Sequence, residues 1–442
     1  MVENILIFFK KVIPMPVFLF FQPFYHLSLA FLAAFFYGFP SRKLKIIGVT
    51  GTNGKTTVVH LLSHILRESG FRTALISSLD FKILNETKKN DLKMTMPGRF
   101  FIQKFLRKCV KNKVEYVILE VTSEGIRQFR HRFIKFGSVI LTNVTPEHIE
   151  SHGSFEKYLE AKISFFHSLS RDAVAVINKD DHFWGKFFEA TRGESAFYSK
   201  EKIIWRGKNF NIRDLSVREE GISFLLDGAV FHSPLLGEFN FYNILAAVSA
   251  AISEDVRFEH IRKSVGSFRG IPGRLEFVRK KPFSVVVDYA HTPDSLRKVY
   301  ETLRELITSN QLLQARRLIC VLGAAGGGRD KWKRPEFGKI AGEFCDEIIL
   351  TNEDPYDENP AEIIEQIAQG FRQPSTANHQ PSTVRKILDR REAIREALKL
   401  AHGGDTVIIT GKGAEPWIMG PKGAKTAWDD REVVKAELEF SE

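Results

Sequence analysis

A glycine-rich turn between an apolar run and a helical segment constrains this chain more than any other feature. The run Lys45–Thr50 predicts a buried strand, and the turn continues through Gly51-Thr52-Asn53-Gly54-Lys55-Thr56-Thr57 into a helix that ends near Glu68. Glycines let backbone N–H groups curl around phosphate oxygens, and the N-terminus of the helix adds a favourable dipole. Lys55 supplies a positive charge for the β- and γ-phosphates, and the Thr56 hydroxyl can bind Mg²⁺. The turn therefore predicts a nucleotide-binding loop.

Short apolar runs alternate with helical segments along the rest of the chain, in two sets that the turn Ile271-Pro272-Gly273 separates. This alternation is typical of parallel sheets covered by helices. We expect an α/β chain with a hydrophobic helical segment (1–44), a central P-loop domain with a mostly parallel sheet (45–270) and a Rossmann-like C-terminal α/β domain (271–442). The predicted strands are Lys45–Thr50, Val114–Val121, Val139–Val144, Ala173–Asn178, a hairpin of Ile222–Leu226 and Ala229–Phe231, then Ser284–Asp288, Leu318–Leu322, Glu347–Thr351 and Thr406–Thr410.

The first 40 residues hold ten of the 38 Phe residues, and no charged side chain occurs over Val17–Phe39. Pro23 interrupts this run, so the predicted helix covers only about Pro23–Tyr37, which is short for a hydrocarbon core of ~30 Å. We therefore favour an interfacial or protein-docked segment over a transmembrane span. The expected location is cytoplasmic, with peripheral membrane contact at the inner face through residues 1–40.

The charge and the cysteines exclude several other classes of protein. The chain carries 64 basic and 53 acidic residues, a net charge of +11, but the charge is spread along it and no nucleic-acid module is present. This favours an anionic substrate or a membrane surface over nucleic acid. Cys109, Cys320 and Cys345 are too few and too scattered for a disulfide framework or a zinc site, which predicts a reducing compartment. We expect a monomer.

Three further side chains suggest a metal site beside the predicted loop. Glu120 ends an apolar run, and a carboxylate at the carboxyl edge of a parallel strand points to where phosphates and metals bind. Lys162 lies on the apolar stripe of the helix after Phe155, where a buried amine must be paired, neutralised or modified, for example as a carbamate. Beside these two residues, His148 is interpreted as a metal ligand.

These motifs and their order resemble the Mur ligases, and within them the type that adds the third residue of the muramoyl peptide (MurE type). The resemblance covers the chain from about Lys45 onward. It implies a nucleotide site and two Mg²⁺ sites, formed by Thr56, Glu120, His148 and a carbamylated Lys162. It also assigns ATP contacts to Asn243, Arg274, Asp288 and His291. The substrate contacts that it implies are Thr95, Ser123, Arg329, Asp354, Gly411 and Glu415.

Two differences from the family's pattern concern the substrates. A UDP-binding domain normally precedes the phosphate loop, and the hydrophobic segment stands in that place. The family's clamp for diaminopimelate is Asp-Asn-Pro-Arg, whereas this chain has Glu353-Asp354-Pro355-Tyr356. The identity of the amino acid and of the group that carries the acceptor therefore stays open at this stage.

The resemblance implies an ATP-dependent ligase of peptidoglycan precursor synthesis, and hence a role in cell-wall biogenesis, cell shape and division. The acceptor carboxylate would attack the γ-phosphate to give an acyl phosphate, and the amine of the amino acid would then displace phosphate. Lys55, Glu120, His148 and Lys162 are the expected catalytic residues. Two alternatives remain: a ligase similar to folylpolyglutamate synthase, or a non-catalytic, membrane-docked nucleotide-binding protein.

Overall fold

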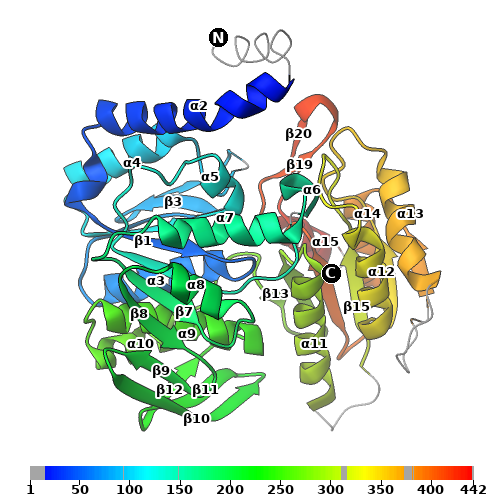
Figure 1. The fold of residues 1–442 in the computed structure, drawn as a ribbon. Helices are drawn as coiled ribbons and strands as arrows, with labels where there is room; N and C mark the ends of the chain where they lie inside the picture. The colour runs from blue at the N-terminus through cyan, green and yellow to red at the C-terminus, as the bar shows by residue number, and fades with distance from the viewer. Residues whose placement is uncertain are drawn as a thin grey trace. The chain divides into compact units, whose positions relative to one another are not determined.

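The computed structural model describes residues 15–92, 94–147, 149–309, 316–372, 381 and 383–440. They form two compact units (Figure 1). Unit 1 contains residues 1–144, 159–210 and 245–264, and unit 2 contains residues 145–158, 211–244 and 265–442. The proposed domain limits at residues 44/45 and 270/271 remain a prediction.

The phosphate-loop strand lies in the middle of the sheet of unit 1. The order β9-β8-β7-β6-β1-β5-β2-β3-β4 holds six neighbouring parallel strands, from β8 to β2, and antiparallel strands flank them. The elements of unit 1 include α2 (Met15–Phe36), η1 (Pro40–Lys43), β1 (Lys45–Thr50), α3 (Lys55–Glu68), β2 (Thr73–Ile76), β3 (Asp80–Ile83), β4 (Glu86–Lys89), α4 (Arg99–Lys111), β5 (Tyr116–Glu120), α5 (Ser123–Arg127), β6 (Ser138–Leu141), α7 (Phe155–His167), β7 (Val174–Asn178), α8 (Trp184–Ala190), β8 (Glu194–Tyr198), β9 (Lys202–Trp205) and α10 (Phe258–Ser267).

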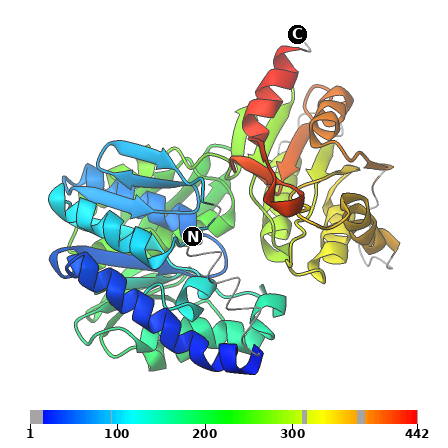
Figure 2. The ribbon, with the colours of Figure 1, turned by 90° about the horizontal axis from the view of Figure 1, so that it is seen from above.

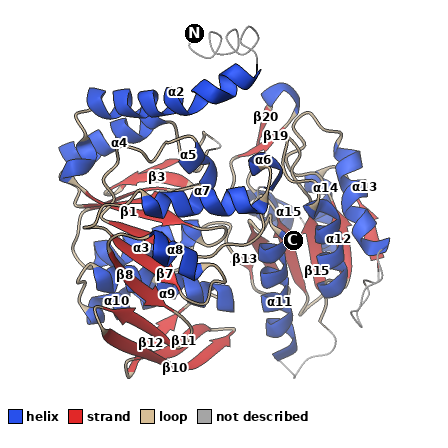
Figure 3. Ribbon diagram, in the orientation of Figure 1, coloured by secondary structure: helices blue, strands red, loops and turns tan. Residues whose placement is uncertain are grey.

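A second sheet forms the centre of unit 2, in the order β13-β14-β18-β15-β16-β17, with all strands parallel except β13. Figure 3 shows helices on the faces of the strands in both units. The remaining elements are α6 (Ile149–His152), β10 (Lys208–Arg218), β11 (Gly221–Leu226), β12 (Ala229–Ser233), α9 (Glu238–Ser253), β13 (Glu276–Arg279), β14 (Ser284–Asp288), α11 (Pro293–Ser309), β15 (Leu318–Leu322), α12 (Lys333–Phe344), β16 (Glu347–Leu350), α13 (Pro360–Ala368), η2 (Gln369–Arg372), β17 (Thr383–Lys386), α14 (Arg390–Leu400), β18 (Thr406–Thr410), β19 (Trp417–Met419), η3 (Pro421–Gly423), β20 (Lys425–Ala427) and α15 (Asp430–Glu439).

Alternation of side chains along the strands gives unit 2 two cores. Side chains of a strand alternate between its faces, so Val286 and Ile408 join one core and Val287 and Ile409 the other. Helices α11, α12 and α13 cover the first core, and α14 and α15 cover the second. Both faces of the parallel strands are thus buried, which explains their nearly continuous apolar sequence.

The predicted strands are confirmed within a few residues, and the predicted hairpin is confirmed as β11 and β12, which pair through Leu226 and Ala229. The prediction for the N-terminal helix was wrong. Helix α2 begins at Met15 and continues through Pro23, because a proline removes one backbone donor but the turns on either side can still form. Among the residues that the structure describes, no helix is long and apolar enough to cross a membrane.

The expectation for the cysteines was also wrong. Cys320 and Cys345 form a disulfide, with 6.1 Å between their Cα atoms. Cys320 lies on β15, and Cys345 lies two residues before the neighbouring strand β16. Their separation of 25 residues in the sequence gives no sign of this proximity, because the pairing of parallel strands creates it.

Ile408→Ala tests the core of unit 2. Ile408 is completely buried in the central strand β18, so the substitution should lower the free energy of unfolding by about 2–5 kcal/mol. Val384→Ala, at an exposed position of the edge strand β17, is the control and should change it by less than about 0.5 kcal/mol. Denaturant unfolding of both variants measures the difference, and equal losses would contradict the core assignment.

Candidate functional site

The phosphate loop adopts a backbone that only glycine can provide at two positions. Gly54 precedes α3 with φ 82°, and Gly51 follows β1 with φ 149°. A Cβ atom on Gly51 would lie 1.9 Å from the Thr142 hydroxyl oxygen, so no larger residue fits there. The loop therefore leads directly into the N-terminus of α3, whose positive dipole end favours an anion.

The segment after the neighbouring strand β6 holds this loop in place. The Asn53 N–H donates to Asn143 Oδ1 at 2.9 Å, and Asn143 Nδ2 donates back to the Asn53 carbonyl at 3.1 Å. The Thr52 N–H donates to the Asn143 carbonyl at 2.8 Å, and the Thr142 hydroxyl donates to the Asn53 carbonyl at 2.7 Å. The sequence analysis predicted no role for Thr142 and Asn143. Their polar side chains near the end of the predicted strand Val139–Val144 were the available signal.

Two lysines donate to the same backbone carbonyl in the loop. Lys55 Nζ lies 3.1 Å from the Gly51 oxygen and 2.7 Å from the Thr52 oxygen, and Lys162 Nζ lies 2.8 Å from the Gly51 oxygen. Lys162 is 1% exposed, which confirms its predicted burial on the apolar stripe of α7. Burial, and next the charge of Lys55, lower the pKa of Lys162 well below its ordinary value. The chain thus holds an amine that loses its proton readily beside the phosphate loop.

A carboxylate and a hydroxyl meet at the start of α3. Thr56 Oγ1 donates to Glu120 Oε2 at 3.1 Å, and the Ser78 N–H donates to the same oxygen at 2.9 Å. Glu120 is buried at the end of β5, which lies beside β1 in the sheet. This pair of oxygen ligands suits Mg²⁺ at a phosphate site. Within the described residues, no group of three His, Cys, Asp or Glu side chains gathers as a metal site.

The structure places the remaining predicted residues of the central region as follows. Ser123 is buried at the first position of α5, and Thr95 is partly exposed in the segment before α4. Asn243 is buried on α9, where its Nδ2 donates to Asn240 Oδ1 at 2.9 Å. Thr57 is buried in the first turn of α3. His148 lies outside the described residues.

In unit 2, predicted residues gather where β14 ends. Asp288 accepts hydrogen bonds of 2.6 Å from the N–H groups of Leu275 and Ala290. The Arg274 guanidinium lies 4.1 Å from the centre of the Tyr289 ring, and His291 Nδ1 lies 3.0 Å from the Tyr289 carbonyl oxygen. Burial raises the pKa of Asp288, and the charge of Arg274 opposes this rise.

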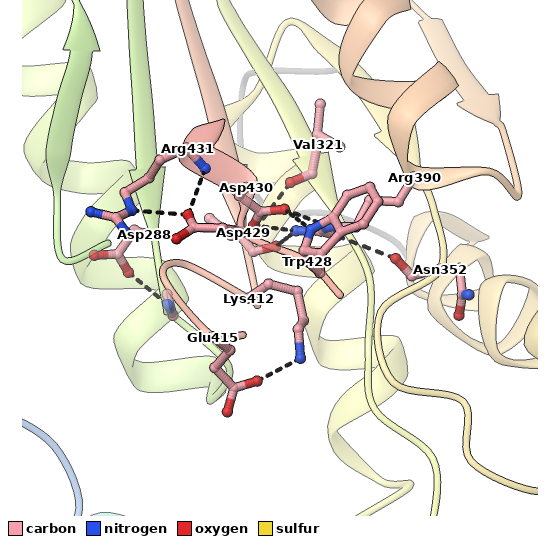
Figure 4. A network of polar contacts seen from close by, with 12 residues as sticks. Asp288, Val321, Asn352, Arg390, Lys412, Glu415, Trp428, Asp429, Asp430 and Arg431 are labelled. Atoms are coloured by element: carbon pink, nitrogen blue, oxygen red, sulfur yellow. Dashed lines mark hydrogen bonds and ion pairs between the residues drawn. The ribbon is translucent and has the colours of Figure 1, made fainter. Parts of the chain in front are cut away.

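A buried lysine joins two of the predicted substrate residues in unit 2. Lys412 Nζ lies 2.8 and 2.9 Å from the two carboxylate oxygens of Asp354 and 2.5 Å from Glu415 Oε2 (the Glu415 contact is shown in Figure 4). Burial alone would lower the pKa of Lys412. The charges of Glu415 and Asp354 outweigh this effect, so the pKa lies above the ordinary value of a lysine. The Tyr289 hydroxyl donates to Glu415 Oε1 at 3.2 Å. Lys412 was not among the predicted site residues, although it lies between two of them, Gly411 and Glu415.

A second buried ion pair anchors the first residue of α15. Arg390 Nε and Nη2 each donate to one carboxylate oxygen of Asp430 at 2.8 Å, and Nη2 also donates to the Thr410 carbonyl at 2.8 Å (Figure 4). Trp428 Nε1 donates to Asp430 at 2.8 Å, and Arg390 Nη1 donates to the Asn352 carbonyl at 3.2 Å. These bonds fix the ends of strands β16 and β18 against one another.

Glu353 lies next to this cluster and is buried. Its Oε2 has no hydrogen-bond partner within the described chain, and it would lie 2.3 Å from a Cβ atom on Gly411, whose φ is 108°. Burial, and next the charge of Asp354, raise the pKa of Glu353 to about 7. Of the remaining predicted residues, Arg329 is exposed on the loop after β15. Asp354, Gly411 and Glu415 are thus brought together around Lys412 and Glu353.

Glu353→Gln tests the burial of this carboxyl group. A raised carboxyl pKa contributes stability below the unfolded-state pKa, and this contribution is lost as pH rises through the folded-state value of about 7. The free energy of unfolding of the natural chain, relative to Glu353→Gln, should fall by on the order of 3 kcal/mol between about pH 4 and about pH 8. Glu362→Gln, at an exposed position of α13, is the matched control for denaturant unfolding. A difference that does not change with pH would contradict the buried, proton-binding carboxyl.

Comparison with known proteins places both halves of the chain in one family. Residues 49–251 match the Mur ligase middle domain, and residues 273–413 match the Mur ligase glutamate ligase domain. Among curated proteins, the UDP-N-acetylmuramoyl-L-alanyl-D-glutamate–2,6-diaminopimelate ligase of Syntrophomonas wolfei is 35% identical over 418 residues, which cover 93% of this chain and 81% of that protein. The ligase with the same name from Gloeobacter violaceus is 37% identical over 414 residues, which cover 92% and 80%.

Solved structures agree in fold. A structure of UDP-N-acetylmuramoyl-L-alanyl-D-glutamate–2,6-diaminopimelate ligase has a TM-score of 0.59 at 30% identity and covers 90% of this chain and 79% of that one. The folylpolyglutamate synthase of Mycobacterium tuberculosis has a TM-score of 0.70, with coverage of 94% and 95%, but at 18% identity it shows likeness of fold alone. The sequence matches over both halves are what decide the family: the chain belongs to the Mur ligases, which are ATP-dependent, Mg²⁺-using acid–amino-acid ligases.

Proposed function

We propose that this chain uses ATP to join an amino acid to the carboxylate of a muramoyl-peptide acceptor in peptidoglycan precursor synthesis. The observation that carries the proposal is the combination of a braced phosphate loop with Lys55, Thr56, Glu120 and Lys162 in a chain of this family. The γ-phosphoryl group passes to a carboxylate oxygen of the acceptor, which gives an acyl phosphate and ADP. The amine then attacks the acyl carbon, an amide forms, and phosphate leaves.

The residues at the start of α3 act on the phosphates. The positive dipole end of α3 orients them, and the Lys55 ammonium neutralises charge on the transferred group. Thr56 and Glu120 supply the oxygen ligands that fit Mg²⁺, which when bound neutralises phosphate charge. The buried carboxylate keeps its position through the Ser78 N–H.

Lys162 is proposed to carry a carbamate. The lowered pKa of Lys162 favours the free base, which is the form that adds CO₂. The added CO₂ would convert the amine into an anion that, with His148, can serve as the ligand set of a second Mg²⁺. Burial protects the carbamate from water.

The remaining assignments follow the motifs. Asn243, Arg274, Asp288 and His291 are proposed as ATP contacts, in which the Arg274 side chain is held by the Tyr289 ring. Thr95 and Ser123 are proposed to contact the acceptor. Arg329, Asp354, Gly411 and Glu415 are proposed to bind the amino acid, with Lys412 holding the two carboxylates in place.

Tyr356 occupies the position at which the diaminopimelate clamp has an arginine. The experiment that identifies the amino-acid substrate therefore does not assume that it is diaminopimelate. The experiment measures phosphate release from ATP with a panel of amino acids that includes 2,6-diaminopimelate. The acceptors are UDP-N-acetylmuramoyl-L-alanyl-D-glutamate and the same muramoyl peptide without UDP. Release that needs both an acceptor and one amino acid supports the proposal. Release with a pteroylglutamate acceptor instead favours the folylpolyglutamate-type alternative, and ATP binding without turnover favours the non-catalytic one.

Lys162→Ala tests the carbamate. The variant should lose at least about 10²-fold of the turnover, because the anion that the carbamate contributes is absent. Short carboxylates such as formate or acetate should restore part of it. Glu160→Ala, on the exposed side of the same helix, is the control and should keep its activity. Full activity of Lys162→Ala without added carboxylate would overturn the assignment.

A further inference from the structure

Helix α2 exposes an apolar surface that the ligase chemistry does not use. We define the α2 aromatic face as the exposed side chains that helical spacing brings to one side of the helix: Phe21, Phe24, Phe31, Leu32, Phe35 and Phe36. Of these, Phe24, Phe35 and Phe36 are 61%, 66% and 73% exposed. Figure 2, seen from above, shows α2 in front of the other described elements of unit 1. Monomeric soluble proteins rarely leave so many large apolar side chains together in water.

Small side chains on the opposite side of α2 form most of its buried contact with unit 1. The opposite side of the helix carries Ala30, Ala33 and Ala34, which are almost fully buried and let the helix lie close to its neighbours. The helix packs against α4. At the edge of the α2 aromatic face, the Phe31 ring contacts Phe133, with 5.4 Å between the ring centres. The packing of α2 thus buries the alanines, whereas Phe24, Phe35 and Phe36 stay mostly exposed.

The elements that pack beside α2 carry positive charge. Residues 15–44 and 94–113, which contain α2, η1 and α4, hold eight basic side chains and no acidic one. We define the cationic rim as the exposed basic residues on η1, on α4 and on either side of Phe133: Arg42, Lys43, Lys104, Arg107, Lys111, Arg132 and Lys135. Among the described side chains, no carboxylate lies within ion-pair distance of a rim residue. The neighbouring Lys108 differs, because it pairs with Glu86 at 2.8 Å.

We infer that the α2 aromatic face and the cationic rim bind the surface of an anionic lipid bilayer. An uncharged aromatic face beside unpaired basic side chains supplies the two signals that stable attachment to a membrane surface requires: buried apolar area and attraction to acidic head groups. The helix lies in the interface with its phenylalanines among the upper acyl chains. This binding is separate from the proposed ligase activity.

Charge distinguishes this occupant from a second copy of the chain. In a twofold dimer the same patch faces itself, so the cationic rim would meet an identical rim with no carboxylate in either patch. An acidic lipid surface provides the missing negative charge over the whole patch. An anionic lipid surface is therefore the binding partner that complements both the α2 aromatic face and the cationic rim.

Vesicle flotation of the full chain tests this inference. The chain should float with phosphatidylcholine–phosphatidylglycerol vesicles, much less with phosphatidylcholine vesicles, and less as salt is raised. Phe24→Ser with Phe35→Ser should weaken association with the anionic vesicles at least about tenfold. The control is Phe440→Ser, an aromatic residue that is 85% exposed in unit 2, and it should bind as the natural chain does. Circular dichroism and gel filtration check that each variant is folded.

A charge-reversal pair separates head-group attraction from general hydrophobicity. Lys104→Glu with Arg107→Glu should weaken association with anionic vesicles, whereas Lys208→Glu with Arg213→Glu, at exposed positions of β10, should not. The inference is overturned if the natural chain does not float with anionic vesicles, or if the rim and face variants bind as well as their controls. It is also overturned if sedimentation velocity shows a dimer that the Phe24→Ser, Phe35→Ser variant dissociates while vesicle binding is absent.

Discussion

The carbonyl group of Gly51 is the point on which the candidate catalytic region depends. It accepts hydrogen bonds from Lys55 and from Lys162, two lysines that are far apart in the sequence. Gly51 can present this carbonyl only because it has no side chain: a Cβ atom would collide with Thr142. One backbone position therefore sets the conformation of the phosphate loop and brings Lys55 near Lys162. The pKa of Lys162 is lowered first by burial and next by the charge of Lys55.

Buried charges organise unit 2 in a comparable way. Lys412 holds Asp354 and Glu415, and Arg390 holds Asp430 together with the backbone ends of two strands. Buried ion pairs add little net stability, but removing one partner leaves a costly unpaired charge, so they fix one geometry strongly. Such positioning is what a site needs if it is to hold a small zwitterion in one orientation. Glu353 lies beside it, and burial, followed by the charge of Asp354, raises the pKa of this carboxyl group to about 7.

The sequence was sufficient for the parts that local patterns determine. The phosphate loop, the parallel strands and the burial of Lys162 follow from glycine spacing, apolar runs and helical periodicity. Contacts made by strand pairing could not be predicted in this way. The brace from Asn143, the Lys412 cluster and the Cys320–Cys345 disulfide depend on which strands become neighbours. The course of α2 through Pro23 was mispredicted because a local rule about proline was given too much weight.

Transfer of oxygen tests the central claim, that the phosphate loop activates a carboxylate of the acceptor. The acceptor is labelled with ¹⁸O in its carboxylates, and the phosphate released during amide formation is examined by mass spectrometry. An acyl phosphate requires that one labelled oxygen leaves with each phosphate, because the bond between carbon and that oxygen breaks when the amine attacks. Phosphate that takes its new oxygen only from water would show that ATP is merely hydrolysed and would contradict the account.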